Sequence, residues 1–437
     1  MGAALAGTAL LALAMMTLRA DAGHTGAAPG GFRFLAILIA LTPMWLLQSV
    51  VGTLRFELGF GDARTWLAAG LLHGLPVLFA WIVARSPADR VRRILLNSLL
   101  SLASTMIALA AFEAFLRLTQ WNASEAATRR EVVGAIPWSL KREPEPMFSM
   151  IPSHEWGHRY GSNERGYFDP DNSVRYKLNS AGFRDDEFRE ERDPSRLRVA
   201  LLGDSFAFGE GVKREDTAAE RIERILTQRA GCPVDVYNFA VPGYASIHEA
   251  WQLESTVSRY SPDLVVVWYF LNDVEVEGTM AFLGRDNPAI FFATYRRFSA
   301  VARFVGARLD GLLRAGKLVR TYEREYTDPE GAWKTARASL ERISHDARES
   351  GSRPVLFVHP VLYRLDGGYP FRDIHDRVTA AARGSGFAAF DLLEAFSGHH
   401  GEELWVHPSD QHPNDIAHEI AAGFAAEKLA PLLGPCP

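Results

Sequence analysis

A serine that could act as a nucleophile follows a strongly apolar segment of the chain. Residues 198–202 predict a buried strand that ends at Gly203, and Ser205 comes two positions later. A serine at a strand-to-helix turn can cap the helix. It can also attack a carbonyl carbon while its own backbone N–H helps to hold the resulting oxyanion. Both interpretations apply to Ser205.

Four further residues could complete such chemistry. Gly243 lies in a loop after the next predicted strand, and Asn272 ends the third. A turn glycine and a capping asparagine are the ordinary explanations, but a backbone N–H or an amide group could also donate to an oxyanion. His412, just before the last predicted helix, could accept the serine proton, and Asp410 could orient its imidazole. Residues of these types, in this order, predict an acyl-transfer site.

The segment His154-Glu-Trp-Gly-His158 offers a competing interpretation, because it matches the HExxH signature of zinc peptidases. Two histidines four positions apart bind one zinc ion when a helix carries both on one face. Pro152 and the glycines at positions 157 and 161 disfavour a helix. We therefore predict an irregular segment here and no metal site.

Strands and helices alternate after residue 195, which predicts a parallel sheet with helices on both faces. Such sheets place their sites outside the carboxyl ends of the strands. The expected strands are residues 198–202, 234–239, 264–271, 354–359 and 387–392, and the expected helices are residues 217–229, 247–260, 333–350, 374–383 and 416–433.

These ordered motifs resemble those of the SGNH hydrolases, also called the GDSL-type esterase/lipase superfamily. The resemblance covers residues 196–433 and rests on Gly203-Asp204-Ser205, Gly243, Asn272-Asp273 and His412-Pro413. It implies a flavodoxin-like three-layer α/β/α domain with Ser205 as nucleophile and His412 as general base. It also implies an oxyanion hole formed by the N–H groups of Ser205 and Gly243 and by the Asn272 side chain, with no metal or organic cofactor.

The acid partner of His412 departs from the family pattern. The family usually has an aspartate three residues before the histidine, where this chain has Ser409. Asp410, two residues before His412, is the expected partner, and Asp415 and Asp391 are the alternatives.

The first 118 residues form an expected membrane region. A transmembrane helix needs about 20 mostly apolar residues. The candidate helices are residues 1–18, 34–54, 65–84 and 94–116, of which the first is marginal and could instead be a signal peptide. The alternative is a set of buried helices in a large soluble core. Residues 119–195 are expected to be a connector with short strands, and residues 196–437 the catalytic domain.

The charged residues and the two cysteines predict how the chain is oriented in the membrane, whether it binds nucleic acid and whether it forms a disulfide. Residues 85–93 hold four arginines, which places this loop in the cytoplasm and everything after residue 120 on the extracytoplasmic side of an inner or plasma membrane. The net charge of −5 gives no argument for a nucleic-acid partner. Cys232 and Cys436 are expected to be ordinary thiols, because they lie far apart in the sequence.

Together these features predict a membrane-anchored serine esterase that acts on ester-bearing substrates, such as an O-acetylated cell-surface polysaccharide. One alternative is an O-acyltransferase that uses the same residues with a partner membrane protein. Another is a non-catalytic protein that binds or assembles glycans. Residues 278–327 are expected to form either a lid or a solvated helical excursion.

Overall fold

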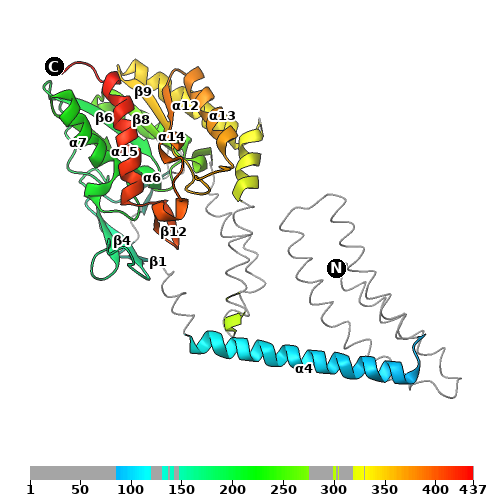
Figure 1. The fold of residues 1–437 in the computed structure, drawn as a ribbon. Coiled ribbons are helices and arrows are strands. Elements are labelled where there is room, and N and C mark those ends of the chain that lie inside the picture. The colour runs from blue at the N-terminus through cyan, green and yellow to red at the C-terminus, as the bar shows by residue number, and fades with distance from the viewer. Residues whose placement is uncertain are drawn as a thin grey trace. The chain divides into compact units, whose positions relative to one another are not determined.

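The computed structural model describes residues 85–119, 130–135, 138–141, 147–274, 299–301, 304, 318–328 and 330–436 (Figure 1). The chain divides into two compact units, one of Met1–Asn122 with Asn287–Lys317 and the other of Ala123–Asp286 with Leu318–Pro437. The second unit contains every candidate site residue named above. The expected lid or excursion at residues 278–327 lies largely outside the described residues.

A five-stranded sheet forms the centre of the second unit. Its strand order is β10-β9-β8-β6-β7, and every neighbouring pair is parallel. The strands are β6 (Leu197–Gly203), β7 (Val234–Asn238), β8 (Leu264–Tyr269), β9 (Arg353–Val358) and β10 (Ala388–Asp391). β6 and β8 are buried along their whole length, which explains their nearly continuous apolar sequence. This strand order is typical of flavodoxin-like sheets and confirms the predicted parallel α/β architecture.

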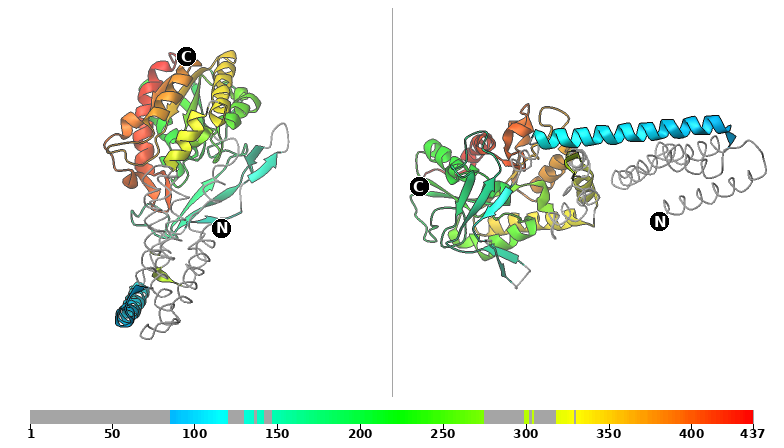
Figure 2. Two further views of the ribbon diagram at one scale, coloured as in Figure 1. Left: turned by 90° about the vertical axis from the view of Figure 1, so that its right-hand side faces the viewer. Right: turned by 90° about the horizontal axis from the view of Figure 1, so that it is seen from below.

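Helices cover both faces of this sheet (Figures 1 and 2). α7 (Ala218–Ala230) packs against α15 (Asp415–Leu429), while α12 (Ala332–Glu349) packs against α8 (Ser246–Ser255) and α13 (Arg372–Gly384). Figure 1 shows α7 on one side of the strands and α12 with α13 on the other. The second unit is therefore built in three layers, with the sheet between two layers of helices.

Three short strands that precede the parallel sheet in sequence form an antiparallel sheet of their own. β4 (Glu155–Tyr160) lies between β1 (Arg130–Val133) and β5 (Ser173–Lys177). Two hairpins are also present: β2 (Trp138–Lys141) with β3 (Met147–Met150), and β11 (Trp405–His407) with β12 (Asp410–Pro413). The residues expected to connect the membrane region to the catalytic domain thus belong, from Ala123 on, to the same compact unit as the parallel sheet.

The HExxH segment forms neither a helix nor an irregular loop. His158 lies within β4, and His154 directly precedes this strand. Gly157 allows the close pairing of β4 with β5, because a Cβ at this position would stand 2.2 Å from the Val174 carbonyl oxygen. The prediction of an irregular segment is wrong, because pairing with two strands overrides the local signal of the glycine. Within the ranges that the structure describes, no three histidine, cysteine, aspartate or glutamate side chains group closely enough to hold a metal ion.

α4 (Ala88–Leu118) contains the membrane helix expected at residues 94–116. Among the helices that the structure describes, none is both long and apolar enough to cross a membrane. The prediction of a membrane span is therefore not supported for residues 94–116. The other expected membrane helices, at residues 1–18, 34–54 and 65–84, lie outside the described residues.

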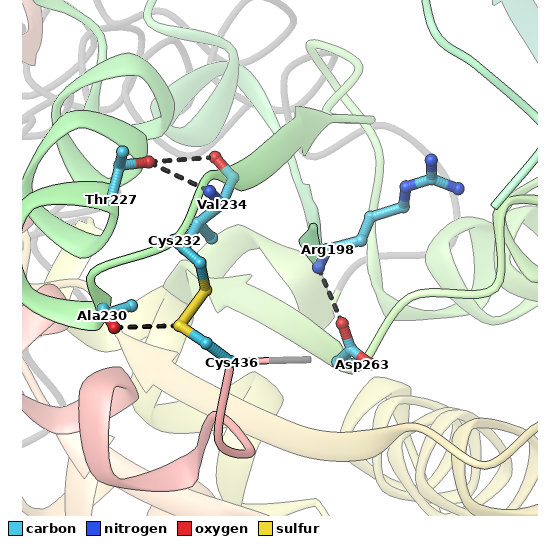
Figure 3. The surroundings of a disulfide bond; sticks show 7 residues. All are labelled: Arg198, Thr227, Ala230, Cys232, Val234, Asp263 and Cys436. Atoms are coloured by element: carbon cyan, nitrogen blue, oxygen red, sulfur yellow. Dashed lines mark hydrogen bonds between the residues drawn. A yellow bond between two sulfur atoms is a disulfide. The ribbon is translucent and has the colours of Figure 1, made fainter. Parts of the chain in front are cut away.

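A disulfide joins Cys232 to Cys436, so the prediction of two ordinary thiols is wrong (Figure 3). Their Cα atoms are 5.9 Å apart, although 204 positions separate them in the sequence. The cause is the packing of α7 against α15, whose N-termini are joined by a hydrogen bond from Ala218 N to His418 Nδ1 at 3.1 Å. The two helices run in the same direction, so the chain end that follows α15 reaches the loop that follows α7.

Reduction of this disulfide is expected to lower the free energy of unfolding by about 2–4 kcal/mol, because the bond closes a long loop in the unfolded chain. Thermal unfolding of the purified protein with and without a reductant measures the effect. The double variant Cys232→Ser/Cys436→Ser should show the lower midpoint under both conditions. A wild-type midpoint that does not respond to the reductant would contradict this expectation.

Candidate active site

Ser205 stands at the first position of a four-residue helix, α6 (Ser205–Phe208), directly after β6. The side chain of Asp204 caps this helix by accepting a hydrogen bond from Phe206 N at 2.8 Å. Gly203 permits the tight turn, because a Cβ at this position would lie 2.6 Å from the Ala207 Cβ. The capping role that the sequence allowed for Ser205 therefore belongs to Asp204.

The β11–β12 hairpin brings a histidine and an aspartate to the Ser205 hydroxyl. His412 Nε2 lies 2.8 Å from Ser205 Oγ, although 207 positions separate the two residues. On the other side of the ring, His412 Nδ1 lies 2.5 Å from Asp410 Oδ1. An imidazole with its hydrogen on Nδ1 donates to the carboxylate and accepts from the hydroxyl. The three side chains thus form a continuous hydrogen-bonded chain beyond the carboxyl end of β6.

Asp410 is buried and is held by two groups besides His412. Its Oδ2 accepts a hydrogen bond from the Tyr160 hydroxyl at 2.8 Å and lies 3.2 Å from Arg130 Nη1. Burial alone would raise the pKa of this carboxyl, but the charge and hydrogen bond of His412, with Arg130 and Tyr160, hold the pKa below its usual range. Asp410 is therefore ionised at neutral pH and can stabilise a charged imidazole.

The two alternative partners of His412, Asp391 and Asp415, are engaged elsewhere, as is Ser409, which stands where the family usually has an aspartate. Ser409 Oγ lies 2.7 Å from a different histidine, on β11. Asp391 Oδ1 lies 2.8 Å from a buried histidine of α13, and Asp415 Oδ1 accepts a hydrogen bond from an arginine at 2.7 Å. Of the positions considered from the sequence, Asp410 is the one that the structure places against the imidazole.

Two of the three expected oxyanion donors, Gly243 and Asn272, lie in the segments that follow the two neighbours of β6, and the third is the N–H of Ser205 itself. The loop after β7 is tied to the end of β6 by a hydrogen bond from Val241 N to Gly203 O at 3.0 Å, and Gly243 in this loop has a φ of 84°. Asn272 lies in the turn after β8, where its Nδ2 donates to Asp204 Oδ2 at 3.0 Å. A carboxamide nitrogen carries two N–H groups, so this contact orients the amide while using one of them.

Three residues beyond those predicted from the sequence, Glu210, Arg130 and Tyr160, also lie at this site. Glu210 Oε2 is 3.7 Å from His412 Nε2. Arg130, on β1, donates from Nη2 to Glu210 Oε1, and Tyr160, on β4, supplies the hydroxyl described above. Glu210 follows Ser205 by only five positions, so its nearness could have been inferred from the sequence. Arg130 and Tyr160 come from strands of only four and six residues, which carry no such signal.

Comparison with known proteins places the chain in a family. The model of the GDSL-like Lipase/Acylhydrolase family matches residues 201–420, half of the chain. No curated protein matches the sequence. Solved structures that resemble this chain include TesA, with 17% sequence identity over 54% of this chain and 100% of that one and a TM-score of 0.37.

Two further similar structures are enzymes with named sources. A lipase/acylhydrolase from Enterococcus faecalis has 15% identity, covers 55% of this chain and 98% of that one, and has a TM-score of 0.35. A variant of Axe2, an acetyl-xylooligosaccharide esterase from Geobacillus Stearmophilus, has 13% identity over 54% and 96% of the two chains and a TM-score of 0.36. The family match alone spans half of the chain, and this protein is therefore a member of the GDSL-like lipase/acylhydrolase family and an enzyme that hydrolyses ester bonds.

Proposed function

We propose that this chain is a membrane-anchored serine esterase that cleaves O-acyl esters through an acyl-enzyme. The observation that carries the proposal is the hydrogen-bonded chain from Ser205 through His412 to Asp410. A hydroxyl, an imidazole and a buried carboxylate in this order are the groups that nucleophilic acyl transfer requires. In this proposal Ser205 is the nucleophile, His412 the general base and Asp410 the group that orients and stabilises the imidazole.

The reaction has two half-reactions. In the first, Ser205 Oγ attacks the ester carbonyl carbon while its proton passes to His412 Nε2, and Asp410 stabilises the resulting imidazolium. His412 then gives the proton to the departing alcohol, and the acyl group stays on Ser205. In the second, a water molecule loses a proton to Nε2 and attacks the acyl carbon. Collapse of this intermediate releases the carboxylic acid, and the proton returns to Ser205 Oγ.

The proposed oxyanion hole consists of the N–H groups of Ser205 and Gly243 and the Asn272 amide. We expect Asn272→Ala to lower kcat about 10²–10³-fold with little change in KM, because the lost donor acts on charge that develops in the transition state. Steady-state kinetics on a soluble acetyl ester measures this effect. A KM that rises while kcat stays constant would instead assign Asn272 to substrate binding.

We further propose that the enzyme is held at an inner or plasma membrane with its catalytic unit on the extracytoplasmic side. Residues 34–54 and 65–84 carry no charge, and segments of this length suit a membrane. The disulfide between Cys232 and Cys436 supports an oxidising compartment for the catalytic unit. α4 also exposes large apolar side chains, namely Leu96, Leu100, Met106, Ile107, Leu109, Phe115 and Leu118.

Membrane attachment and sidedness can be tested together. The full chain should stay in the membrane fraction after alkaline carbonate extraction. Protease added to the outside of spheroplasts should degrade the region after residue 120. Release by carbonate would contradict anchoring, and protection from external protease would contradict the proposed sidedness.

An acylated glycan is the substrate class that we propose for this site. A cavity of about 210 Å³ lies beside the β11–β12 hairpin that carries His412. Its lining includes His407 of this hairpin but neither Ser205 nor His412. Its walls include two aromatic rings, Tyr167 and Trp405, together with the charged side chains of Arg165 and Glu402. Aromatic faces with polar groups around them suit a ligand that is apolar on its faces and polar at its edges, as a sugar ring is.

The purified full-length protein should release acetate from a chromogenic acetyl ester and from an O-acetylated polysaccharide. Turnover of the small ester alone would contradict the proposal of a glycan substrate, but the proposed esterase activity would still hold. Turnover that requires an added acceptor sugar would identify an O-acyltransferase. Saturable glycan binding without turnover of either compound would contradict the enzymatic proposal and favour a binding role.

A further inference from the structure

Two carboxylates flank the imidazole of His412, one on each side of the ring. Asp410 contacts Nδ1, and Glu210 Oε2 lies 3.7 Å from Nε2, the atom that faces Ser205. A single guanidinium bridges both carboxylates, because Arg130 Nη2 donates to Glu210 and Arg130 Nη1 lies 3.2 Å from Asp410. Three charged residues therefore act on His412: Asp410, which belongs to the serine–histidine–aspartate chain, and Glu210 and Arg130, which do not.

The loop that carries Glu210 is firmly held. The Glu210 backbone N–H donates to Ser205 O at 3.1 Å, and the next N–H, from Gly211, donates to the Tyr176 hydroxyl at 2.7 Å. The buried guanidinium of Arg184 donates to three carbonyl groups of this loop, those of residues 208, 209 and 212. The carboxylate of Glu210 is thus fixed relative to the serine and the histidine.

Burial makes these charges effective. The side chains of Glu210 and Asp410 are 9% and 1% exposed, so little water screens them, and Arg130 is 29% exposed. Other titratable groups lie near His412 or Asp410, namely His158 and Tyr160 of β4, Tyr176 of β5, Asp204 of the turn before α6, and His418 of α15. His407 of β11, the strand that pairs with β12, is also buried.

Most of these surrounding groups are uncharged at neutral pH. Burial and Arg130 lower the pKa of His158 to about 3, and burial also holds the pKa of His418 well below its usual value. Burial raises the pKa of Tyr176 to about 12 and that of Tyr160 well above its usual value. Besides Asp204, whose pKa burial raises, the groups that form ion pairs with or beside His412 are Asp410, Glu210 and Arg130.

We propose that Glu210 and Arg130 are positioning residues that set the charge balance of His412, with Glu210 favouring the imidazolium and Arg130 opposing it. This inference rests on the proposed role of His412 as general base. Glu210 stabilises the charged ring that forms when Nε2 takes the serine proton. Arg130 lies against both carboxylates and offsets part of their negative charge, which opposes the imidazolium.

Part of the proposed site lies outside the residues that the family model matches. Arg130 lies on β1, far before residue 201, where the family match begins. The sheet formed by β1, β4 and β5 therefore contributes charge to the site as well as support for it.

The pH dependence of Ser205 labelling by a fluorophosphonate tests this inference. The labelling reaction requires a neutral His412, and it can be measured without knowing the substrate. The full-length protein is labelled between pH 4 and 9. In Glu210→Gln, the pH at which the rate falls on the acid side should move down by about one unit, since a nearby negative charge is lost. In Arg130→Gln it should move up by about one unit, and Arg130→Lys should restore the wild-type position.

Glu215→Gln is the matched control, because Glu215 is an exposed glutamate five positions further along the chain. It should leave the profile unchanged. Profiles of Glu210→Gln and Arg130→Gln that shift in the same direction, or that lose rate without shifting, would overturn the inference, since a purely structural role produces no opposed shifts. Absence of Ser205 labelling in the wild-type protein would instead reject the proposed function, and with it the inference that rests on it.

Discussion

Ser205→Ala is expected to lower kcat for ester hydrolysis by about 10⁴-fold or more, because no acyl-enzyme can form without the hydroxyl. Any residual activity would come from the oxyanion hole and from substrate binding. The fold should be unaffected, because Asp204, and not Ser205, caps α6. Steady-state kinetics on an acetyl ester, with thermal unfolding as a check on folding, measures both effects.

Ser409→Ala provides the matched control for this variant. Ser409 lies three positions before His412, but its hydroxyl contacts another histidine, on β11. We expect its loss to change kcat by less than about tenfold, far less than the loss of the Ser205 hydroxyl. Comparable losses in the two variants would show that the nucleophile has been assigned to the wrong serine.

Asp410→Asn is expected to lower kcat by about 10⁴-fold. The amide group of asparagine can donate to His412 Nδ1, which would leave the ring hydrogen on Nε2. In that tautomer Nε2 cannot accept the serine proton, although the geometry is unchanged. The same substitution also removes the negative charge that stabilises the imidazolium during attack.

Asp415→Asn separates this effect from a general loss of charge near the hairpin. Asp415 pairs with Arg165 at 2.7 Å and not with the imidazole, so its substitution should leave kcat nearly unchanged. Because Asp415 was one of the alternative partners considered from the sequence, the pair of variants decides which carboxylate acts on the histidine. A large loss in Asp415→Asn with little loss in Asp410→Asn would contradict the assignment.

The parallel sheet and the edge that carries the site could be predicted, because the sequence of each strand and of the residues that follow it is a local pattern. Each strand ends in a recognisable residue, such as Ser205 after β6 and Asn272 after β8. The rule that parallel strands align their carboxyl ends then brings these ends together. The contact of His412 with Ser205 follows instead from the order of the motifs, because His412 lies on β12 of a separate antiparallel hairpin. The catalytic roles themselves remain predictions for the variants above.

The contacts made by the antiparallel strands could not be predicted, because they depend on long-range packing. Arg130 lies 80 positions from Glu210, and Tyr160 lies 250 positions from Asp410. Strands of four to six residues have no periodicity long enough to reveal which of their faces meets the parallel sheet. The sequence therefore indicated only a connector where the structure places part of the site.

The disulfide and the HExxH segment also show that local sequence patterns do not reveal long-range packing. Cys232 and Cys436 meet because two helices pack side by side, which no local pattern reveals. In the other case the local signals of Pro152 and the glycines misled, because they predicted an irregular segment where the chain forms β4. His158 belongs to a strand and contacts the Tyr176 hydroxyl at 3.1 Å, so its spacing from His154 has none of the meaning that it would have on a helix.

The most direct test of the central claim is to identify the residue that a fluorophosphonate probe modifies in the full-length protein. Peptide mapping by mass spectrometry should find the adduct on Ser205, and His412→Ala should slow its formation by at least about 10²-fold, because the general base is lost. An adduct on another serine, or labelling of Ser205 that does not depend on His412, would contradict the proposed mechanism.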